Sequence, residues 1–130
     1  MILDTSFLID LFDGQSAAFE AGRDMADRNV VQRVPAPVVT ELSYGVTFGD
    51  EEERRQVDNA LRMYPIVDLD GVMADRAGEL LATADRRANG DSGVEWIEAM
   101  IGAVADQFDE PVVTANVDDF ERLGVDTETY

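Results

Sequence analysis

Cysteine, histidine and lysine are all absent from this chain of 130 residues, and only 8% of its residues are aromatic. Without cysteine the chain has no disulfide framework, thiolate zinc site or cysteine nucleophile. Without histidine it has no Ser-His-Asp triad and no histidine-ligated metal. No apolar run approaches about 18 residues, and the acidic start MILDTSFLID lacks the positive charge of a signal peptide. We therefore expect a soluble, cytoplasmic protein that does not associate with membranes.

Positive charge is also scarce: ten basic residues, all of them arginine, stand against 28 acidic ones, for a formal net charge of −18. The acids are spread along the chain, which argues against a disordered acidic tail. Runs such as 51–53 (EEE) are typical of a solvated face. So acidic a surface argues against broad binding of a phosphate backbone, which normally uses basic patches. A nucleic-acid role would therefore need a local counter-charge, such as a metal ion.

The length and the hydrophobic content of 45% predict a single packed domain over residues 1–130. Short apolar runs alternate with helical patterns, which predicts an α/β fold with a short, mostly parallel sheet flanked by helices. We predict strands over residues 1–3, 30–34, 65–69 and 111–115, and a last one from about Val125. We predict helices from Thr5 or Ser6 to Gly14, from Ser16, from about Pro37, and over 50–63, 70–88, 95–108 and 118–123.

Acidic side chains follow two predicted strands at the points where the strands end. Asp4 comes directly after the first strand, and Asn116, Asp118 and Asp119 follow the strand at 111–115. Open α/β sheets bind ligands beyond the carboxyl ends of their strands. If the two strands are neighbours in the sheet, these side chains meet at one site.

Two further acids are predicted to lie in the first turns of helices that aim at the same crevice. These are Glu41, after the second strand, and Glu98, which borders the buried stripe of its helix. Each acid also has a purely structural interpretation. Asp4 could be a helix N-cap, Asp119 a turn or cap residue, and Glu41, Glu98 and the neighbouring Glu95 could stabilise a helix macrodipole.

Clustered carboxylates cannot all stay ionised without a counter-charge. Since lysine and histidine are absent, a divalent cation is the natural partner, and oxygen-only ligands suit Mg²⁺ or Mn²⁺. Such a site can activate water and hold a phosphodiester for in-line attack. It would also let a very acidic protein bind a nucleic-acid backbone locally.

Four short motifs follow one another in order: MILDTS (1–6), PAPVVTELSYG (35–45), EAMIGAVA (98–105) and PVVTANVDDF (111–120). With them the whole chain resembles a PIN-domain ribonuclease, and most of all a VapC-type toxin of a type II toxin–antitoxin pair. Glu98 departs from the family pattern, which usually has aspartate there. The lysine-free, acid-coated composition resembles that of a halophilic member.

The resemblance implies a PIN-like fold and a Mg²⁺- or Mn²⁺-dependent endoribonuclease that cleaves RNA phosphodiester bonds. It also implies a homodimer and a cognate antitoxin, whose arginine would inhibit by replacing the charge of the metal. The catalytic and metal-binding residues it implies are Asp4, Glu41, Glu98 and Asp119. The supporting residues it implies are Ser6, Thr114, Asn116 and Asp118.

Three other interpretations stay open. A phosphotransfer receiver domain also gathers acids at strand ends, but its pattern needs a lysine. A haloacid-dehalogenase-like phosphatase needs that lysine too, and a second acid two residues after Asp4, where Ser6 stands. The third is a PIN-like binding or scaffold module with a degraded site, which should not bind Mn²⁺ through Asp4.

Overall fold

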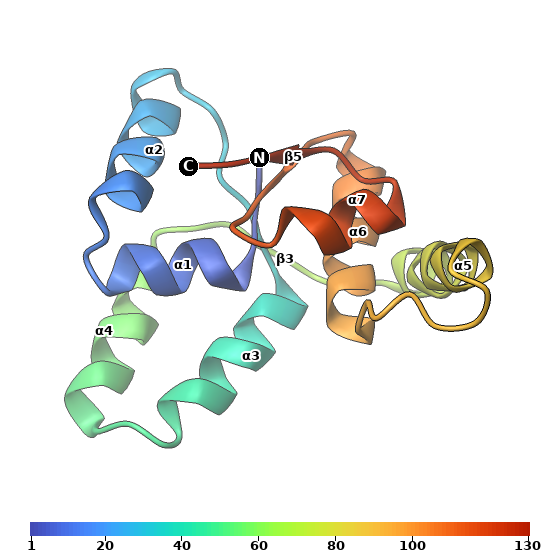
Figure 1. Ribbon diagram of the computed structural model, residues 1–130. Helices are drawn as coiled ribbons and strands as arrows, with labels where there is room; N and C mark the ends of the chain where they lie inside the picture. Colours follow the sequence, from blue (N-terminus) through green and yellow to red (C-terminus); the bar gives the residue numbers. More distant parts are fainter.

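The computed structural model describes residues 1–130 and contains seven helices and five very short strands (Figure 1). No helix is both long enough and apolar enough to cross a membrane. The strands are β1 (Ile2–Leu3), β2 (Val34–Pro35), β3 (Ile66–Val67), β4 (Val112–Val113) and β5 (Thr127–Glu128). The helices are α1 (Thr5–Phe12), α2 (Ser16–Asp27), α3 (Ala36–Val46), α4 (Glu51–Leu61), α5 (Gly71–Arg87), α6 (Trp96–Phe108) and α7 (Val117–Leu123).

All strand pairs are parallel, and a switch in strand order falls next to β1. One group has the order β1-β4-β5 and the other pairs β2 with β3. A single parallel bridge between Ile2 and Arg33 joins them, so the spatial order is β3-β2-β1-β4-β5. After β1 the chain adds β2 and β3 on one side of that strand. It then returns and adds β4 and β5 on the other side. Open α/β sheets bind ligands at this kind of switch point.

The predicted α/β class is confirmed, and its core explains why the strands are so apolar. In Figure 1 helices flank the short strands, with α1, α2 and α4 toward the left of the view and α5, α6 and α7 toward the right. Strands covered on both faces are hydrophobic throughout rather than alternating, and both residues of β1 and of β4 are buried. The core cluster of 26 buried hydrophobic residues includes Phe7 of α1 and Phe120 of α7, both fully buried.

The strands are shorter than predicted from the sequence, because some of the expected strand N–H groups donate to carbonyls at helix ends instead. The strand expected over 30–34 begins only at Val34, because the N–H of Val30 donates to the carbonyl of Met25 at the end of α2. The strand expected from Val125 begins at Thr127, since the N–H of Val125 donates to an α7 carbonyl. The strands expected over 65–69 and 111–115 shrink to two residues each.

The predicted place of Glu41 in its helix is wrong. Pro35 is extended, with φ −63° and ψ 144°, and α3 begins immediately after it, at Ala36. Glu41 is therefore the sixth residue of α3 rather than a first-turn acid, and the macrodipole does not account for it. Pro37 does lie in the first turn of the helix, as predicted.

Candidate active site

Asp4 lies at the centre of the site, directly after β1 and next to the end of β4. Its side chain is buried, at 6% exposure. It occupies the N-cap position of α1, as its structural interpretation expected, but its carboxylate makes no capping hydrogen bond. Instead Oδ2 accepts hydrogen bonds from Ser6 Oγ and Thr114 Oγ1, each at 2.7 Å. The capping interpretation of Asp4 therefore does not describe its side chain.

The second carboxylate oxygen of Asp4 is left open. Oδ1 accepts no hydrogen bond from the protein, whereas both hydroxyl donors go to Oδ2. No buried side-chain oxygen or nitrogen in the molecule lacks a partner, so Oδ1 borders solvent. The carboxylate of Asp4 is thus held in a fixed orientation, with one oxygen free for a cation or its water.

The polar residues around Asp4 fasten the ends of β1 and β4 to each other. The hydroxyls of Ser6 and Thr114 are 3.2 Å apart. The N–H of Ala115 donates to Ser6 Oγ at 3.1 Å, and the N–H of Asn116 donates to Thr114 Oγ1 at 2.9 Å. Ser6, Thr114 and Asp4, all named from the sequence, are therefore assembled into one network.

Glu41 reaches the site through a residue that sequence reasoning missed. The hydroxyl of Thr5, at the start of α1, donates a hydrogen bond to Glu41 Oε2. This contact aligns α3 with the carboxyl end of β1. The only sequence signal for this contact was a hydroxyl residue directly after Asp4.

Glu98 caps its own helix and is also repelled by other predicted site acids. Its Oε2 accepts the N–H of Glu95 at 3.1 Å, so it caps the start of α6. Burial raises the pKa of Glu98 above its ordinary value, and the negative charges of Glu95, Asp119 and Glu41 raise it further. These repulsions place Glu98 in the same electrostatic cluster as two of the other predicted acids.

Asp119 is held from both sides. Asn116 Nδ2 donates to its Oδ2 at 2.6 Å, and Arg122 Nη1 donates to its Oδ1 at 2.8 Å. Sequence reasoning missed Arg122, which lies one turn along α7 from Asp119. Asp118 is exposed and makes no hydrogen bond to the cluster, so the structure does not bring this predicted supporting residue together with the others.

Tyr130 and Asp10 form a hydrogen-bonded pair beside the network, and no pattern in the sequence pointed to either. The hydroxyl of Tyr130 donates to Asp10 Oδ2 at 2.8 Å, and its ring packs edge-on against Phe7 with 5.1 Å between centroids. Burial, followed by the Asp10 hydrogen bond, raises the pKa of Tyr130 to about 12, while a hydrogen bond from Ser6 opposes the rise. Tyr130 thus remains a neutral donor beside the site.

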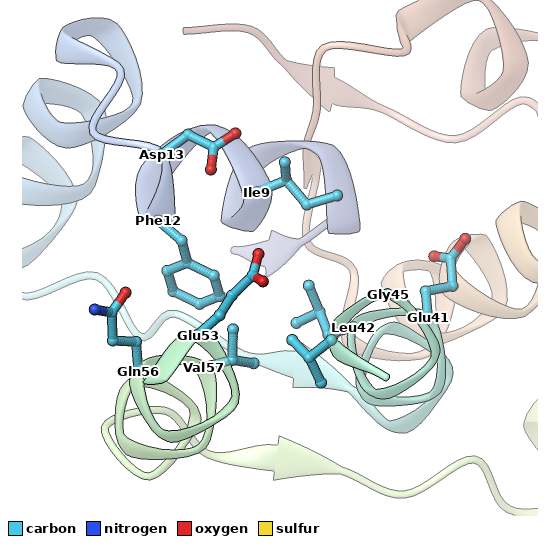
Figure 2. A pocket seen from close by; sticks show the side chains of 10 residues that line it. Ile9, Phe12, Asp13, Glu41, Leu42, Gly45, Glu53, Gln56 and Val57 are labelled. Carbon is cyan, nitrogen blue, oxygen red and sulfur yellow. The ribbon is translucent and has the colours of Figure 1, made fainter. Parts of the chain in front are cut away.

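A hollow of about 320 Å³ opens next to Glu41, between α1, α3 and α4 (Figure 2). Its apolar lining includes Phe12, Leu42 and Val57, and in Figure 2 the Glu53 side chain extends toward the middle of it. Asp13 and Glu41 add two more carboxylates. The hollow therefore combines an apolar floor with negative charge.

The acids fit Mg²⁺ or Mn²⁺ in their chemistry, although they do not form a closed cage. No group of three acidic side chains lies close enough to ligate one ion together. Magnesium usually binds through one or two carboxylates and keeps several waters. An oriented Asp4 with a free oxygen suits that mode of binding.

Comparison with known proteins identifies the family to which this chain belongs. The PIN domain family model matches residues 1–126, and the chain belongs to that family. A search of curated protein sequences gave no match.

Several solved structures share the fold over nearly the whole chain. A chain of VapBC2 from Rickettsia felis, bound to a DNA fragment from its promoter, has a TM-score of 0.85 at 20% identity and covers 99% of this chain and 97% of its own. DNA-bound VapBC from Salmonella typhimurium has a TM-score of 0.81 at 23% identity, with coverages of 98% and 96%. VapC20 of Mycobacterium tuberculosis, a toxin that cleaves the sarcin-ricin loop, has a TM-score of 0.68 at 20% identity, with 95% of each chain covered.

Proposed function

We propose that this protein is a Mg²⁺- or Mn²⁺-dependent endoribonuclease that hydrolyses RNA phosphodiester bonds and acts as the toxin of a toxin–antitoxin pair. The observation that carries the proposal is the buried Asp4 at the switch point, held by two hydroxyls with one carboxylate oxygen left open. Membership of the PIN domain family supports it. The similarity to toxin–antitoxin complexes and to a toxin that cleaves RNA supports the biological role.

The residues that would hold the metal, directly or through water, are Asp4, Glu41, Glu98 and Asp119. A bound Mg²⁺ or Mn²⁺ would supply charge neutralisation at the phosphate and activation of a water molecule. Without such a cation, these neighbouring carboxylates repel an RNA phosphate and each other. Burial raises the pKa of Glu98, and the repulsion by neighbouring carboxylates raises it further.

The chain's own polar groups would orient the acids. Ser6 and Thr114 fix Oδ2 of Asp4, which leaves the other oxygen in a set direction. Asn116 and Arg122 fix the two carboxylate oxygens of Asp119. Orientation of this kind matters because reacting groups must be held within a fraction of an ångström of their productive positions.

An antitoxin would be the regulatory partner of this site. The hollow beside Glu41 offers an apolar floor and carboxylates at its edge, which suits an apolar segment that carries arginine. A guanidinium paired with a carboxylate would take the place of the cation's charge. We also propose that the protein forms a homodimer, which sedimentation would test.

A second candidate is a PIN-fold binding module without catalysis. Two observations favour it: no three acids are close enough to ligate one ion, and Arg122 already neutralises Asp119. Glu98 in place of aspartate is a third departure from an active site. This candidate would bind a partner or RNA but would not cleave.

RNA cleavage in high salt with Mn²⁺ distinguishes the two candidates. We expect cleavage that EDTA abolishes and that Asp4→Asn reduces by at least about a hundredfold, since the variant loses the oriented anion. Asp58→Asn, an exposed acid on α4, is the matched control and should cleave like the wild type. A folded wild type that neither cleaves RNA nor binds Mn²⁺ in calorimetry would favour the binding module.

A further inference from the structure

The ten arginines are the only positive side chains of this acidic chain, and their places decide where a phosphate backbone can be held. Half of them are already engaged in ion pairs with carboxylates: Arg28, Arg33, Arg55, Arg76 and Arg122. The other five form no ion pair: Arg23, Arg54, Arg62, Arg86 and Arg87. Only these have their whole charge free for a ligand.

One surface hollow brings a free arginine and a paired one together. It has a volume of about 310 Å³, lies between the C-terminal end of α5 and α7, and is lined by Ala84, Arg87, Ala88, Ser92, Glu121 and Arg122. By contrast, the hollow near α2 has a single arginine in its lining. The hollow beside Glu41 and the one near Glu110 have none.

Arg122 joins this hollow to the candidate active site. It lines the hollow, and its Nη1 donates to Asp119 Oδ1 at 2.8 Å. The other oxygen of Asp119 accepts from Asn116. The arginine hollow and the carboxylate cluster are therefore neighbours with a shared wall.

The loop at the rim of the hollow is tied down. The N–H and Oγ of Ser92 both donate to Asp85 Oδ1, at 2.9 and 2.6 Å. Ser92 Oγ in turn accepts the N–H of Val94 at 3.3 Å. The rim thus has a defined shape, while Arg87 and Arg122 remain exposed.

The position of Arg87 in the last turn of α5 has a structural explanation too, because a cation there favours the helix macrodipole. That explanation covers Arg86 equally well. It does not account for a second arginine from a different helix on the opposite wall, next to the acids.

We propose that this hollow is a phosphate subsite for RNA, an inference that rests on the proposed ribonuclease function. In it Arg87 and Arg122 bind a phosphodiester next to the one that lies at the carboxylates. Guanidinium groups form strong, directional hydrogen bonds with phosphate oxygens. Without such a contact, an RNA strand that crosses the cluster would meet negative charge on both sides of the scissile bond.

Binding of a single-stranded RNA oligonucleotide to the Asp4→Asn protein, measured by fluorescence anisotropy over a series of NaCl concentrations, tests the subsite without cleavage. Adding Arg87→Gln should weaken binding about threefold, the usual range for one exposed ion pair. It should also reduce the slope of log affinity against log salt by about 0.7, the value for one phosphate contact on a single strand. Arg87→Lys should keep most of the slope.

Arg62→Gln is the matched control, since Arg62 is another exposed, unpaired arginine and lies at the end of α4. It removes the same charge and should leave both the affinity and the slope as they were. Equal effects of the two glutamine variants would overturn the subsite, because net charge alone would then explain them. Failure of the Asp4→Asn protein to bind RNA would also overturn it, while cleavage by the wild type would still decide the proposed function separately.

Discussion

Glu98 is a side chain on which two demands conflict. As the third residue of α6 it caps the helix through the N–H of Glu95, and a negative charge there suits the helix N-terminus. Yet burial and the charges of Glu95, Asp119 and Glu41 raise its pKa. The folded protein therefore holds a proton on Glu98 more tightly than the unfolded chain does. This arrangement favours cation binding, because a bound cation would relieve the repulsion between Glu98 and the other carboxylates.

Replacing Glu98 with glutamine should stabilise the metal-free protein at neutral pH. Because the folded pKa lies above the unfolded one, the carboxyl contributes its stability below the unfolded pKa and loses it as pH rises through the folded pKa. Glu98→Gln avoids that loss, and glutamine can still accept the capping hydrogen bond. The gain should be below about 1 kcal/mol, since the side chain is only half-buried.

Urea unfolding in EDTA measures this effect. The advantage of Glu98→Gln should be present near neutral pH. It should disappear as the pH falls below about 4, where the Glu98 carboxyl becomes protonated in both the folded and the unfolded protein. Mn²⁺ should stabilise the wild type more than the variant. Glu95→Gln, at the exposed end of the capping box, is the control and should gain less. A variant no more stable than the wild type at neutral pH would show that repulsion does not govern Glu98.

Site residues that lie next to the end of a strand were predictable from the sequence. Asp4, Ser6 and Thr114 follow or end β1 and β4, so their meeting depends only on the two strands being neighbours. Thr5 and Arg122 were missed because their contacts depend on how α3 packs against α1 and on side-chain direction within α7. Neither of these is encoded in spacing alone.

Among the elements, helices were predictable and strand lengths were not. The helical periods of α5 and α6 extend over 17 and 13 residues, so tertiary contacts change them little. A strand of two residues has no period, and its limits depend on which backbone groups the adjoining helix ends have already used. The start of α3 lies within one residue of its predicted place, but Glu41 is in the second turn because the helix begins directly after the extended Pro35.

Two substitutions in α5 should change stability in opposite directions. Asp70 caps the helix by accepting the N–H of Met73 at 2.8 Å, so Asp70→Ala should cost about 1 kcal/mol. Gly78 lies inside the helix, and a Cβ built there meets nothing within 4 Å. Gly78→Ala should therefore gain up to about 1 kcal/mol.

Chemical denaturation of both α5 variants, followed by circular dichroism, checks these values. Asp70→Asn keeps the capping oxygen and should lie near the wild type. RNA cleavage by Gly78→Ala should be unchanged, because residue 78 touches neither the acids nor the arginine hollow. A destabilised Gly78→Ala protein would contradict the prediction that a methyl group fits at residue 78 without a clash.

The charge of −18 acts on the molecule as a whole rather than on any one site. Its few ion pairs join mostly exposed groups, which contribute little each. The remaining acids repel one another through solvent, so compactness itself is opposed at low ionic strength. Salt of about 1 M shortens the Debye length from about 10 Å at 0.1 M to about 3 Å, which removes most of this repulsion.

We therefore expect the melting temperature to rise with KCl, by on the order of 5–10 °C up to about 1 M, equivalent to about 1–2 kcal/mol. A variant with Asp27→Asn, Asp58→Asn and Asp75→Asn separates charge screening from general salt effects. These three acids are exposed and make no hydrogen bond or ion pair. The variant should have a higher melting temperature than the wild type at low salt. The two melting temperatures should converge at high salt, because salt then screens the repulsion that the substitutions remove. Parallel curves for the two proteins would show that salt acts on hydrophobic burial instead, and a melting temperature independent of KCl would show that the acidic surface does not limit stability.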